Sequence, residues 1–323
     1  MRIAVTGGSG FIASHVVDQL VADGNEVVVI DHRVRPHRAD VGFEDIDILN
    51  LSALIQATKG CDYLFHLAAV SNVNYAHKYP VYTVDLNING TANVLEAARL
   101  NSIRRVFFAS TVWVYTGTRG NGSLGEDEPF YLPDAGHIYT SSKIASEMII
   151  HNYWQLYQQP FTILRYGIPY GPRMREELVI PIFIRKALAG EPIVIQGDGS
   201  QYRNYVYIDD LARAHMLALS GRAENQVYNL EGAQKITIKD IADTINKVMG
   251  GGVKIEYVPA RPGDYAGKEV SARKILNELE WEPKVGFEEG MRRTIEWFKP
   301  LYQSNSSTPV GANGARTVQE LHA

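Results

Sequence analysis

The sequence predicts an α/β fold, in which a doubly wound parallel sheet is followed by a smaller C-terminal α/β domain. Three observations predict it. Short apolar runs alternate with segments of helical periodicity over the first half of the chain. The run Val27–Ile30 is apolar at every position, as expected for a strand inside a parallel sheet that is covered on both faces. The composition, with 45% apolar and 21% charged residues, is that of a globular protein with a large core.

The elements are expected to alternate, which implies right-handed βαβ units. The first strand, at 3–5, leads into a helix at 11–22 that ends at Asp23-Gly24-Asn25. The following strands and helices are expected at 27–30, 51–58, 63–67, 91–100, 105–109, 141–157 and 161–165. Beyond residue 170 the spacing changes, and we expect helices within 176–188, at 240–249 and at 290–298, with a strand at 254–258.

These patterns predict two domains. The N-terminal domain comprises residues 1–166 and also receives part of 205–230, and the smaller second domain comprises residues 167–302. Residues 303–323 are small, polar and aperiodic, which indicates a disordered tail.

Charge and residue content exclude several classes of protein. Lys and Arg number 32 against 36 Asp and Glu, and the net charge of −4 argues against a nucleic-acid-binding protein, which usually carries a basic surplus. The single cysteine, Cys61, cannot form a disulfide within the chain, and the nine histidines have no metal-ligand spacing. No apolar run reaches the ~18 residues of a membrane span, and a strand follows Met1 without a signal-peptide pattern. We therefore expect a cytoplasmic protein with no metal site and no nucleic-acid or membrane partner.

The segment Thr6–Ala13, between the first strand and the first helix, has the features of a dinucleotide-binding turn. Gly7 permits a tight turn, Gly10 lets the backbone approach a pyrophosphate, and Ala13 allows the helix to pack closely on the strand. The free N–H groups at the start of the helix then face the phosphates. This arrangement predicts a Rossmann-type nucleotide-binding domain.

An acidic residue at the end of the second strand indicates which dinucleotide binds. Asp31 lies at about the ~20-residue offset expected for a carboxylate that accepts hydrogen bonds from the adenosine ribose. The same carboxylate repels a 2′-phosphate, so we expect NAD rather than NADP. Arg33 is the residue that could instead reach a 2′-phosphate, and we interpret it as a solvated loop residue.

Tyr139 and Lys143 form a Tyr-x-x-x-Lys pair where the helix at 141–157 begins. A spacing of four places both side chains on one face, one turn apart. An ammonium group beside a phenol favours the phenolate and lowers the pKa of tyrosine from its usual ~10, so the pair suits proton transfer near neutral pH. Thr111 follows the strand at 105–109, at the edge where doubly wound sheets bind ligands, and its hydroxyl can hydrogen-bond the same substrate oxygen.

These motifs, with others in the same order, resemble those of the extended short-chain dehydrogenase/reductases, and in particular the nucleotide-sugar epimerase/dehydratase family. The resemblance covers about residues 1–300. Besides the turn and the Tyr139/Lys143 pair, the matching pieces are Asp47-Ile48, His66-Leu67-Ala68-Ala69, Asn87-x-x-Gly90-Thr91, Ser110-Thr111 with Tyr115, Tyr170-Gly171-Pro172, Gly197-Asp198-Gly199 with Arg203-Asn204-Tyr205, Tyr228-Asn229-Leu230 and Arg261-Pro262-Gly263-Asp264.

The resemblance implies roles for individual residues. Thr111, Tyr139 and Lys143 are the implied catalytic set. The implied NAD-binding residues are Gly7, Gly10, Phe11, Ile12, Asp31, Asp47, Ile48, Leu67, Ala68, Ala69, Asn87, Tyr139, Lys143 and Tyr166. The implied substrate-binding residues are Thr111, Arg203, Arg261 and Asp264, with the two arginines holding the substrate diphosphate. A homodimer is also implied, through a four-helix bundle built from 91–100 and 141–157.

The implied activity is that of an NAD-dependent nucleotide-sugar 4-epimerase, which acts through a transient 4-keto sugar on a UDP-hexose or UDP-hexuronic acid. An NAD(P)H-dependent 4-keto-sugar reductase uses the same three side chains and is the alternative. A 4,6-dehydratase is disfavoured because Val112 and Trp113, which follow Thr111, cannot transfer a proton. A non-catalytic NAD-sensing protein is disfavoured by the intact catalytic set.

Ala13 stands where the third glycine of the turn is usual, and its small size is compatible with the turn. The sequence departs from the family pattern at three further places. Gly167-Ile168 stands where Phe-Asn is usual in sugar epimerases, Thr116 replaces a glycine, and the loop at 134–138 is longer than usual. All three border the implied sugar site, so the resemblance leaves the sugar open.

Overall fold

The computed structural model describes residues 1–118, 122–260 and 268–304, which group into two compact units. Among these residues, the first unit comprises 1–118, 122–169, 203–235 and 268–285, and the second comprises 170–202, 236–260 and 286–304. The chain therefore returns to the first unit twice. The second return, at 268–285, was not predicted from the sequence.

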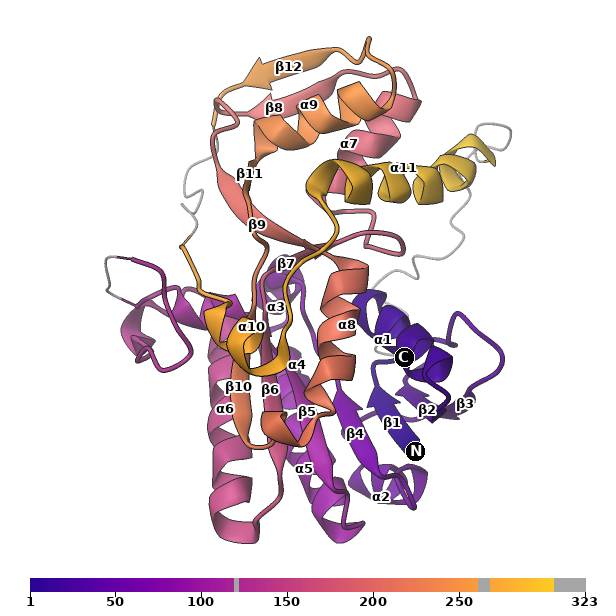
Figure 1. Cartoon of the computed structure of the whole chain (residues 1–323), viewed down its shortest axis with the longest axis vertical. Helices are drawn as coiled ribbons and strands as arrows, with labels where there is room; N and C mark the ends of the chain where they lie inside the picture. The colour runs from indigo at the N-terminus through magenta and orange to yellow at the C-terminus, as the bar shows by residue number, and fades with distance from the viewer. Residues whose placement is uncertain (119–121, 261–267, 305–323) are drawn as a thin grey trace. The chain divides into compact units, whose positions relative to one another are not determined.

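A seven-stranded sheet forms the centre of the first unit, in the strand order β10-β6-β5-β4-β1-β2-β3 (Figure 1). Its neighbouring strands are parallel, as predicted, and the order reverses between β1 and β4, so the sheet is doubly wound. The strands are β1 (Arg2–Thr6), β2 (Glu26–Asp31), β3 (Gly42–Asp45), β4 (Tyr63–His66), β5 (Arg105–Thr111), β6 (Phe161–Tyr166) and β10 (Gln226–Leu230).

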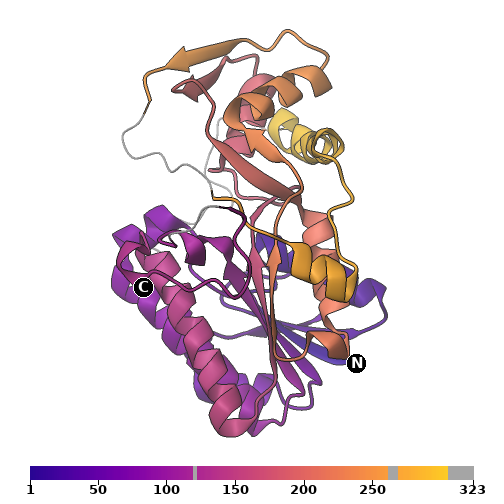
Figure 2. The same ribbon diagram turned by 60° about the vertical axis from the view of Figure 1, so that its left-hand side comes forward.

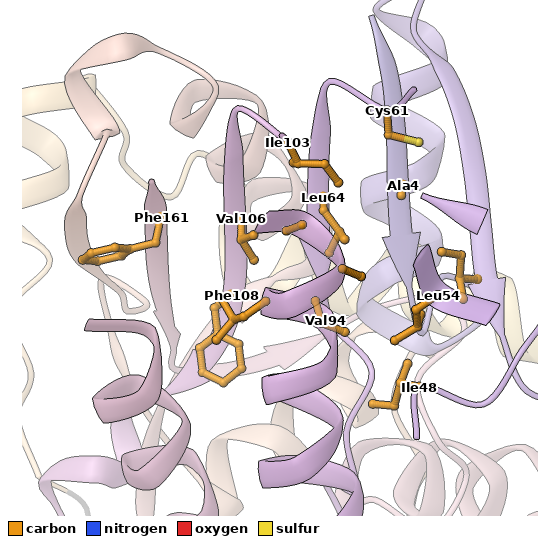
Figure 3. Close-up of a cluster of buried hydrophobic side chains, with 14 of the residues drawn as sticks. Ala4, Ile48, Leu54, Cys61, Leu64, Val94, Ile103, Val106, Phe108 and Phe161 are labelled. Atoms are coloured by element: carbon orange, nitrogen blue, oxygen red, sulfur yellow. The ribbon is translucent and has the colours of Figure 1, made fainter. Parts of the chain in front are cut away.

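Helices cover both faces of this sheet, because alternate strand residues point to opposite sides. On one face, α2 (Leu51–Ala57), α5 (Gly90–Leu100) and α6 (Ile138–Tyr157) pack on Leu64, Phe108 and other apolar side chains (Figure 3). On the other face, Phe65 and Phe107 stack with ring centroids 4.2 Å apart, and His215 of α8 (Ile208–Ala218) lies against Phe65. Helix α1 (Phe11–Ala22) packs against α8, while α5 and α6 run side by side (Figures 1 and 2).

Several elements of the first unit were not predicted from the sequence. Between β4 and α5 the chain forms α3 (Val73–Lys78), α4 (Pro80–Val84) and a π-helical turn, η1 (Asp85–Asn89), that continues directly into α5. A Cβ atom added at Gly90, where α5 begins, would lie 2.5 Å from Ile48 Cδ1, so glycine allows this helix to approach the segment before α2. Short 3₁₀ turns η2 (Val112–Tyr115), η3 (Leu132–Asp134) and η4 (Gly221–Ala223) and the helix α10 (Arg273–Leu279) complete the unit.

The second unit contains α7 (Val179–Leu188), β8 (Ile193–Gln196), α9 (Ile238–Val248), β12 (Ile255–Val258) and α11 (Phe287–Ser304). Strands β8 and β12 are parallel, and Thr237 and Asp240 form a capping box that starts α9. Strands β7 (Ile168–Tyr170), β9 (Tyr202–Tyr207) and β11 (Lys235–Thr237) form a further sheet in the order β11-β9-β7. Helix α11 includes residues 303 and 304, and the rest of the predicted tail, 305–323, lies outside the described residues. No helix in the described part of the chain has the length and apolar character needed to cross a membrane.

Candidate active site

The predicted dinucleotide-binding turn links β1 to α1 at the carboxyl edge of the sheet. Gly7 has φ +69°, and a Cβ atom there would lie 2.7 Å from both Cα and N of Ala68, so only glycine fits. Gly10 is the exposed N-cap of α1, which leaves the start of the helix open to a ligand. Phe11 and Ile12, both half-buried, form the first turn of α1. These residues provide the open helix N-terminus that an anionic phosphate requires.

Asp31 ends β2 beside this turn. Its two carboxylate oxygens accept hydrogen bonds from the backbone N–H groups of Ser9 and His32, at 2.9 and 2.8 Å. Burial raises the pKa of Asp31, and both N–H donors oppose that shift by stabilising the carboxylate. Arg33 is exposed, and its backbone N–H donates to Asp45. The carboxylate thus holds the turn through Ser9, and its role toward the ribose stays a prediction.

We expect NAD to bind more tightly than NADP, because the Asp31 carboxylate would meet a 2′-phosphate with like charge. Calorimetric titration with both dinucleotides measures the difference. The variant Asp31→Asn retains an oxygen that can accept from Ser9 and removes the charge, so it should narrow the preference. Tighter binding of NADP to the unmodified protein would contradict this assignment and point to Arg33 as a phosphate ligand.

The loop after β4 contains Leu67, Ala68 and Ala69, all half-buried, and is held in place by Asn87. The Asn87 side chain is buried: its Oδ1 accepts from the N–H of Val70, and its Nδ2 donates to the Val70 carbonyl and to Ser142 Oγ. The π-helical turn η1 therefore presents an amide that joins this loop to α6. In the structure the polar atoms of Asn87 hydrogen-bond to Val70 and Ser142, and its predicted place on the cofactor side stays a prediction.

Asp47 and Ile48, two of the implied NAD-binding residues, differ in how far their side chains are buried. Asp47 is half-buried and accepts a hydrogen bond from the N–H of Leu49. Ile48 is only 4% exposed and belongs to the apolar cluster beneath α5, where it is labelled in Figure 3. The Ile48 side chain therefore packs in the core, and the part of it that remains for a ligand is small.

Thr111, Tyr139 and Lys143 come from two elements, the last residue of β5 and the start of α6. Thr111 is 6% exposed, and its Oγ1 accepts a hydrogen bond from the N–H of Trp113. Tyr139 is the second residue of α6 and is half-buried. Lys143 follows one turn later and is buried; its Nζ donates to the Ala109 carbonyl at 2.8 Å. The helix begins at Ile138, three residues before its predicted start, and Lys143 contacts β5 through the Ala109 carbonyl.

Lys143 has little solvent around its charge. Burial lowers the pKa of Lys143 to about 7, and the Glu147 carboxylate, one turn further along α6, acts in the opposite direction. The ammonium also lies 4.6 Å from the centre of the Phe108 ring. The charge of this lysine at neutral pH thus depends first on its burial and then, in the opposite direction, on Glu147.

Glu147 belongs to a buried polar network that the sequence analysis did not identify. Its carboxylate accepts from Ser110 Oγ at 2.5 Å and from the Arg165 guanidinium at 2.7 Å, and both charged side chains are at most 5% exposed. Arg165 also donates to the Tyr115 hydroxyl, which donates in turn to Asn229 Oδ1. The one available signal was the spacing of Glu147 from Lys143, which places both on the same face of a helix.

Tyr166, another predicted cofactor residue, directs its hydroxyl into the core. The hydroxyl lies 2.6 Å from His215 Nε2, and His215 Nδ1 lies 2.9 Å from the Leu211 carbonyl. A carbonyl can only accept, so Nδ1 carries the proton and Nε2 accepts from Tyr166. Burial lowers the pKa of His215 to about 4, which keeps it neutral, and burial together with Tyr139 raises the pKa of Tyr166. The effect of Tyr139 indicates that the two tyrosines are neighbours.

Two histidines, His137 and His66, have defined hydrogen-bond partners. His137 is half-buried and caps α6, with its Nδ1 accepting from the N–H of Thr140, and its ring lies 4.8 Å from that of Trp113. His66 is buried between Thr6 and Thr91, whose hydroxyls lie 2.8 and 3.0 Å from its two nitrogens. His66 is therefore a hydrogen-bonded core residue.

The predicted substrate residues are only partly described. Arg203 lies half-buried in β9, and its positive charge opposes the effect of burial, which raises the pKa of Tyr205 to about 12. Arg261 and Asp264 lie outside the described residues. Among the described residues, no three His, Cys, Asp or Glu side chains are grouped so that they could hold a metal ion.

Comparison with known proteins identifies the family to which the chain is similar. Residues 3–230 match the model of the NAD dependent epimerase/dehydratase family. The chain is 31% identical over 313 residues to the UDP-glucose 4-epimerase of Mycolicibacterium smegmatis. The alignment covers 93% of this chain and 99% of that protein.

Solved structures agree with this assignment. The UDP-glucose 4-epimerase of Thermotoga maritima with UDP-glucose has a TM-score of 0.86 at 31% identity, covering 93% of this chain and 99% of that one. The UDP-glucuronic acid 4-epimerase of Bacillus cereus with UDP-glucuronic acid and NAD has a TM-score of 0.84 at 29% identity, covering 94% and 100%. Sequence relatives at 32% identity are also described as dTDP-glucose 4,6-dehydratases. With its parallel sheet, its glycine-containing turn and its Tyr-x-x-x-Lys helix, the chain is thus a member of the NAD-dependent epimerase/dehydratase family.

Proposed function

We propose that the protein is a nucleotide-sugar 4-epimerase that converts its substrate through a transient 4-keto sugar. The observation that carries this proposal is the placement of Thr111, Tyr139 and Lys143 at one edge of the sheet, with a hydroxyl, a phenol and a buried amine on adjoining elements. The substrate class is a UDP-hexose or a UDP-hexuronic acid. Similarity to 4-epimerases over more than nine-tenths of the chain supports the same reaction.

The residues around the turn fit NAD, the cofactor of the family. Gly7 and Gly10 leave room for the pyrophosphate at the start of α1, and the Asp31 carboxylate suits the ribose hydroxyls. Leu67, Ala68 and Ala69 lie next to Gly7 along the path of the dinucleotide. When bound, NAD supplies the acceptor and donor of a hydride.

The chain's own residues perform the proton transfer and the positioning. Tyr139 takes the proton of the C4 hydroxyl as the C4–H bond breaks and returns it when the bond forms again on the opposite face of the sugar. Lys143, when protonated, stabilises the Tyr139 phenolate. Thr111 Oγ1 donates to the same substrate oxygen and holds it beside Tyr139. Thr111 and Lys143 are buried and Tyr139 is half-buried, which limits competition from water.

Dehydration needs an additional acid and base next to the sugar, and the residues after Thr111 do not provide them. Val112 packs against an apolar cluster, and Trp113 lies against His137. Neither side chain transfers a proton. This distinguishes the proposed reaction from that of the dTDP-glucose 4,6-dehydratase relatives.

The experiment that tests the proposal is a panel of nucleotide sugars followed by NMR. We expect interconversion of C4 epimers to an equilibrium mixture, with no added NADH or NADPH required. Steady consumption of NADH or NADPH with a 4-keto sugar would instead establish a reductase, and release of water with loss of the C6 hydroxyl would establish a dehydratase.

We also propose a homodimer formed through α5 and α6. Large apolar side chains that are about half exposed or more gather there: Leu100 at the end of α5, and Met148, Leu156 and Tyr157 on α6. Exposed apolar groups of this size on adjacent helices are typical of an interface. By contrast, Ile144 of α6 is buried in the protein's own core, so it is not part of this surface.

Light scattering at micromolar concentration is expected to give the mass of two chains. The double variant Met148→Glu/Leu156→Glu places charges on this surface and should shift the protein to a monomer. A wild-type monomer at these concentrations would contradict the dimer.

A further inference from the structure

Glu231 is a buried carboxyl group that the proposed reaction does not use. It follows the last residue of β10, and its side chain is 6% exposed. The carboxyl group occupies the space beside Gly167: a Cβ atom added to Gly167 would lie 2.6 Å from Glu231 Oε1. Any larger residue at 167 would therefore displace the carboxyl group. Glycine at this position, one of the departures from the family pattern, makes room for Glu231.

The sheet register places Glu231 at the edge that binds ligands. Thr111 of β5 pairs with Tyr166 of β6, and Tyr166 pairs with Leu230 of β10, so the three strand ends form one row. Glu231 is the next residue after that row. Neighbouring strands lie ~4.8 Å apart, so two spacings separate the backbones of Thr111 and Glu231 by ~10 Å. Both residues therefore lie at the carboxyl edge of the sheet, two strands apart, where a ligand bound at this edge can reach them.

The surroundings of Glu231 contain few polar partners. Among the described residues, no other side chain forms an ion pair or a hydrogen bond with the Glu231 carboxyl group. The backbone N–H of Gly232 is the group that stabilises its charged form. Burial raises the pKa of Glu231 to about 8. The neighbouring strand β6 contributes Tyr166, and Tyr205 of β9 lies with its backbone against Gly232. Burial raises the pKa of both tyrosines, so both are neutral, and β9 also carries the positively charged Arg203. At neutral pH the carboxyl group is therefore mostly protonated and can donate a hydrogen bond.

We propose that Glu231 is a specificity-determining residue of the substrate site, which hydrogen-bonds a neutral hydroxyl of the sugar and discriminates against a hexuronate. This inference rests on the proposed function, because it places a nucleotide sugar between Thr111 and Glu231. A hexuronate would bring a second carboxylate into a poorly solvated place next to Glu231, and that carboxylate would be repelled once Glu231 ionises. The preferred substrate class is thus a nucleotide hexose with uncharged substituents.

The test compares the binding of UDP-glucose and UDP-glucuronate by calorimetry at pH 6.5, 8 and 9, in the presence of NAD. Because both ligands contain UDP, any effect of pH or of a substitution on UDP binding cancels in the ratio of the two dissociation constants. In the wild type, we expect UDP-glucose to bind more tightly, and the ratio to widen by up to about tenfold from pH 8 to 9, since hexuronate binding requires one proton on Glu231. The variant Glu231→Gln keeps the size and an N–H donor but cannot ionise, so its ratio should not change over this range.

Controls separate this effect from loss of structure. Glu224→Gln changes an exposed carboxylate just before β10, at the opposite end from Glu231, and should keep the wild-type ratio at every pH. Circular dichroism establishes that each variant is folded. Gly167→Ala should also reduce the discrimination, because it displaces the carboxyl group, and it should have no such effect when combined with Glu231→Ala.

The two proposals fail in different ways. A ratio that does not depend on pH in the wild type, or that depends on it equally in Glu231→Gln, overturns the role of Glu231 even if C4 epimers interconvert. Tighter binding of UDP-glucuronate than of UDP-glucose also overturns it. If the discrimination follows Glu231 but no C4 interconversion occurs, the substrate preference stands and the proposed epimerase reaction fails.

Discussion

Replacing Tyr139 with phenylalanine is expected to lower kcat by about 10²–10⁴-fold, because the change removes the group that accepts and returns the proton of the substrate hydroxyl. The site should otherwise be intact, since Tyr139 is half-buried at the start of α6 and loses one oxygen only. Measuring kcat and KM by the NMR assay checks this. The effect should fall on kcat, because the lost interaction acts in the transition state.

Thr111→Val is the matched control for this prediction. It removes a hydroxyl from the same site but leaves the proton acceptor, so its kcat should fall less than that of Tyr139→Phe. Thermal unfolding should be measured for both variants, because Thr111 Oγ1 also accepts a hydrogen bond from Trp113. Near-normal turnover of folded Tyr139→Phe would show that another group transfers the proton.

Replacing Glu147 with glutamine is expected to destabilise the protein by about 3–5 kcal/mol, because it leaves the buried guanidinium of Arg165 without its counter-charge. It should also lower the pKa of Lys143 below its present value of about 7, since Glu147 is the charge that supports the ammonium. If protonated Lys143 stabilises the Tyr139 phenolate, the decline in activity at high pH should then begin at a lower pH. Urea unfolding and a pH–rate profile measure the two effects separately.

Two further variants test the physical cause of this loss. In Glu147→Met/Arg165→Met both charges are removed, and much of the stability should return, because no unpaired charge remains in the core. Glu289→Gln removes an exposed partner of Arg292 and should change stability little. If Glu147→Gln were as stable as the wild type, the charge of Arg165 would have to be compensated by groups other than Glu147.

The sheet and its main helices could be predicted because their signals are local. The apolar run of β2 and the glycines after β1 report burial and turn geometry directly. Strand β3 was missed because it is a short edge strand with mostly exposed, polar residues, so it carries no apolar pattern. The region from α3 to η1 was missed because Pro80 divides it and its last turn is π-helical, which breaks the 3.6-residue period.

In the candidate site, too, only the residues with a local sequence signal could be predicted. Tyr139 and Lys143 were predicted because they are four positions apart on one helix. Glu147, which acts on the charge of Lys143, is on the same helix, but its own partner Arg165 comes from a distant segment. The two meet only because β6 lies beside β5 and under α6. The burial of Glu231 likewise depends on the absence of a side chain at Gly167 on the neighbouring strand. Such pairs depend on strand order, which a local pattern does not encode.

The position of Cys61 provides the protein with a built-in reporter of local opening. The thiol lies among the apolar side chains between α2 and β4, is 6% exposed, and has a pKa that burial raises (Figure 3). A thiol reagent attacks the thiolate, so the folded state is protected both by lack of access and by lack of ionisation. Because the sequence contains a single cysteine, the labelling rate reports the opening of this one corner of the sheet, without a background from other thiols.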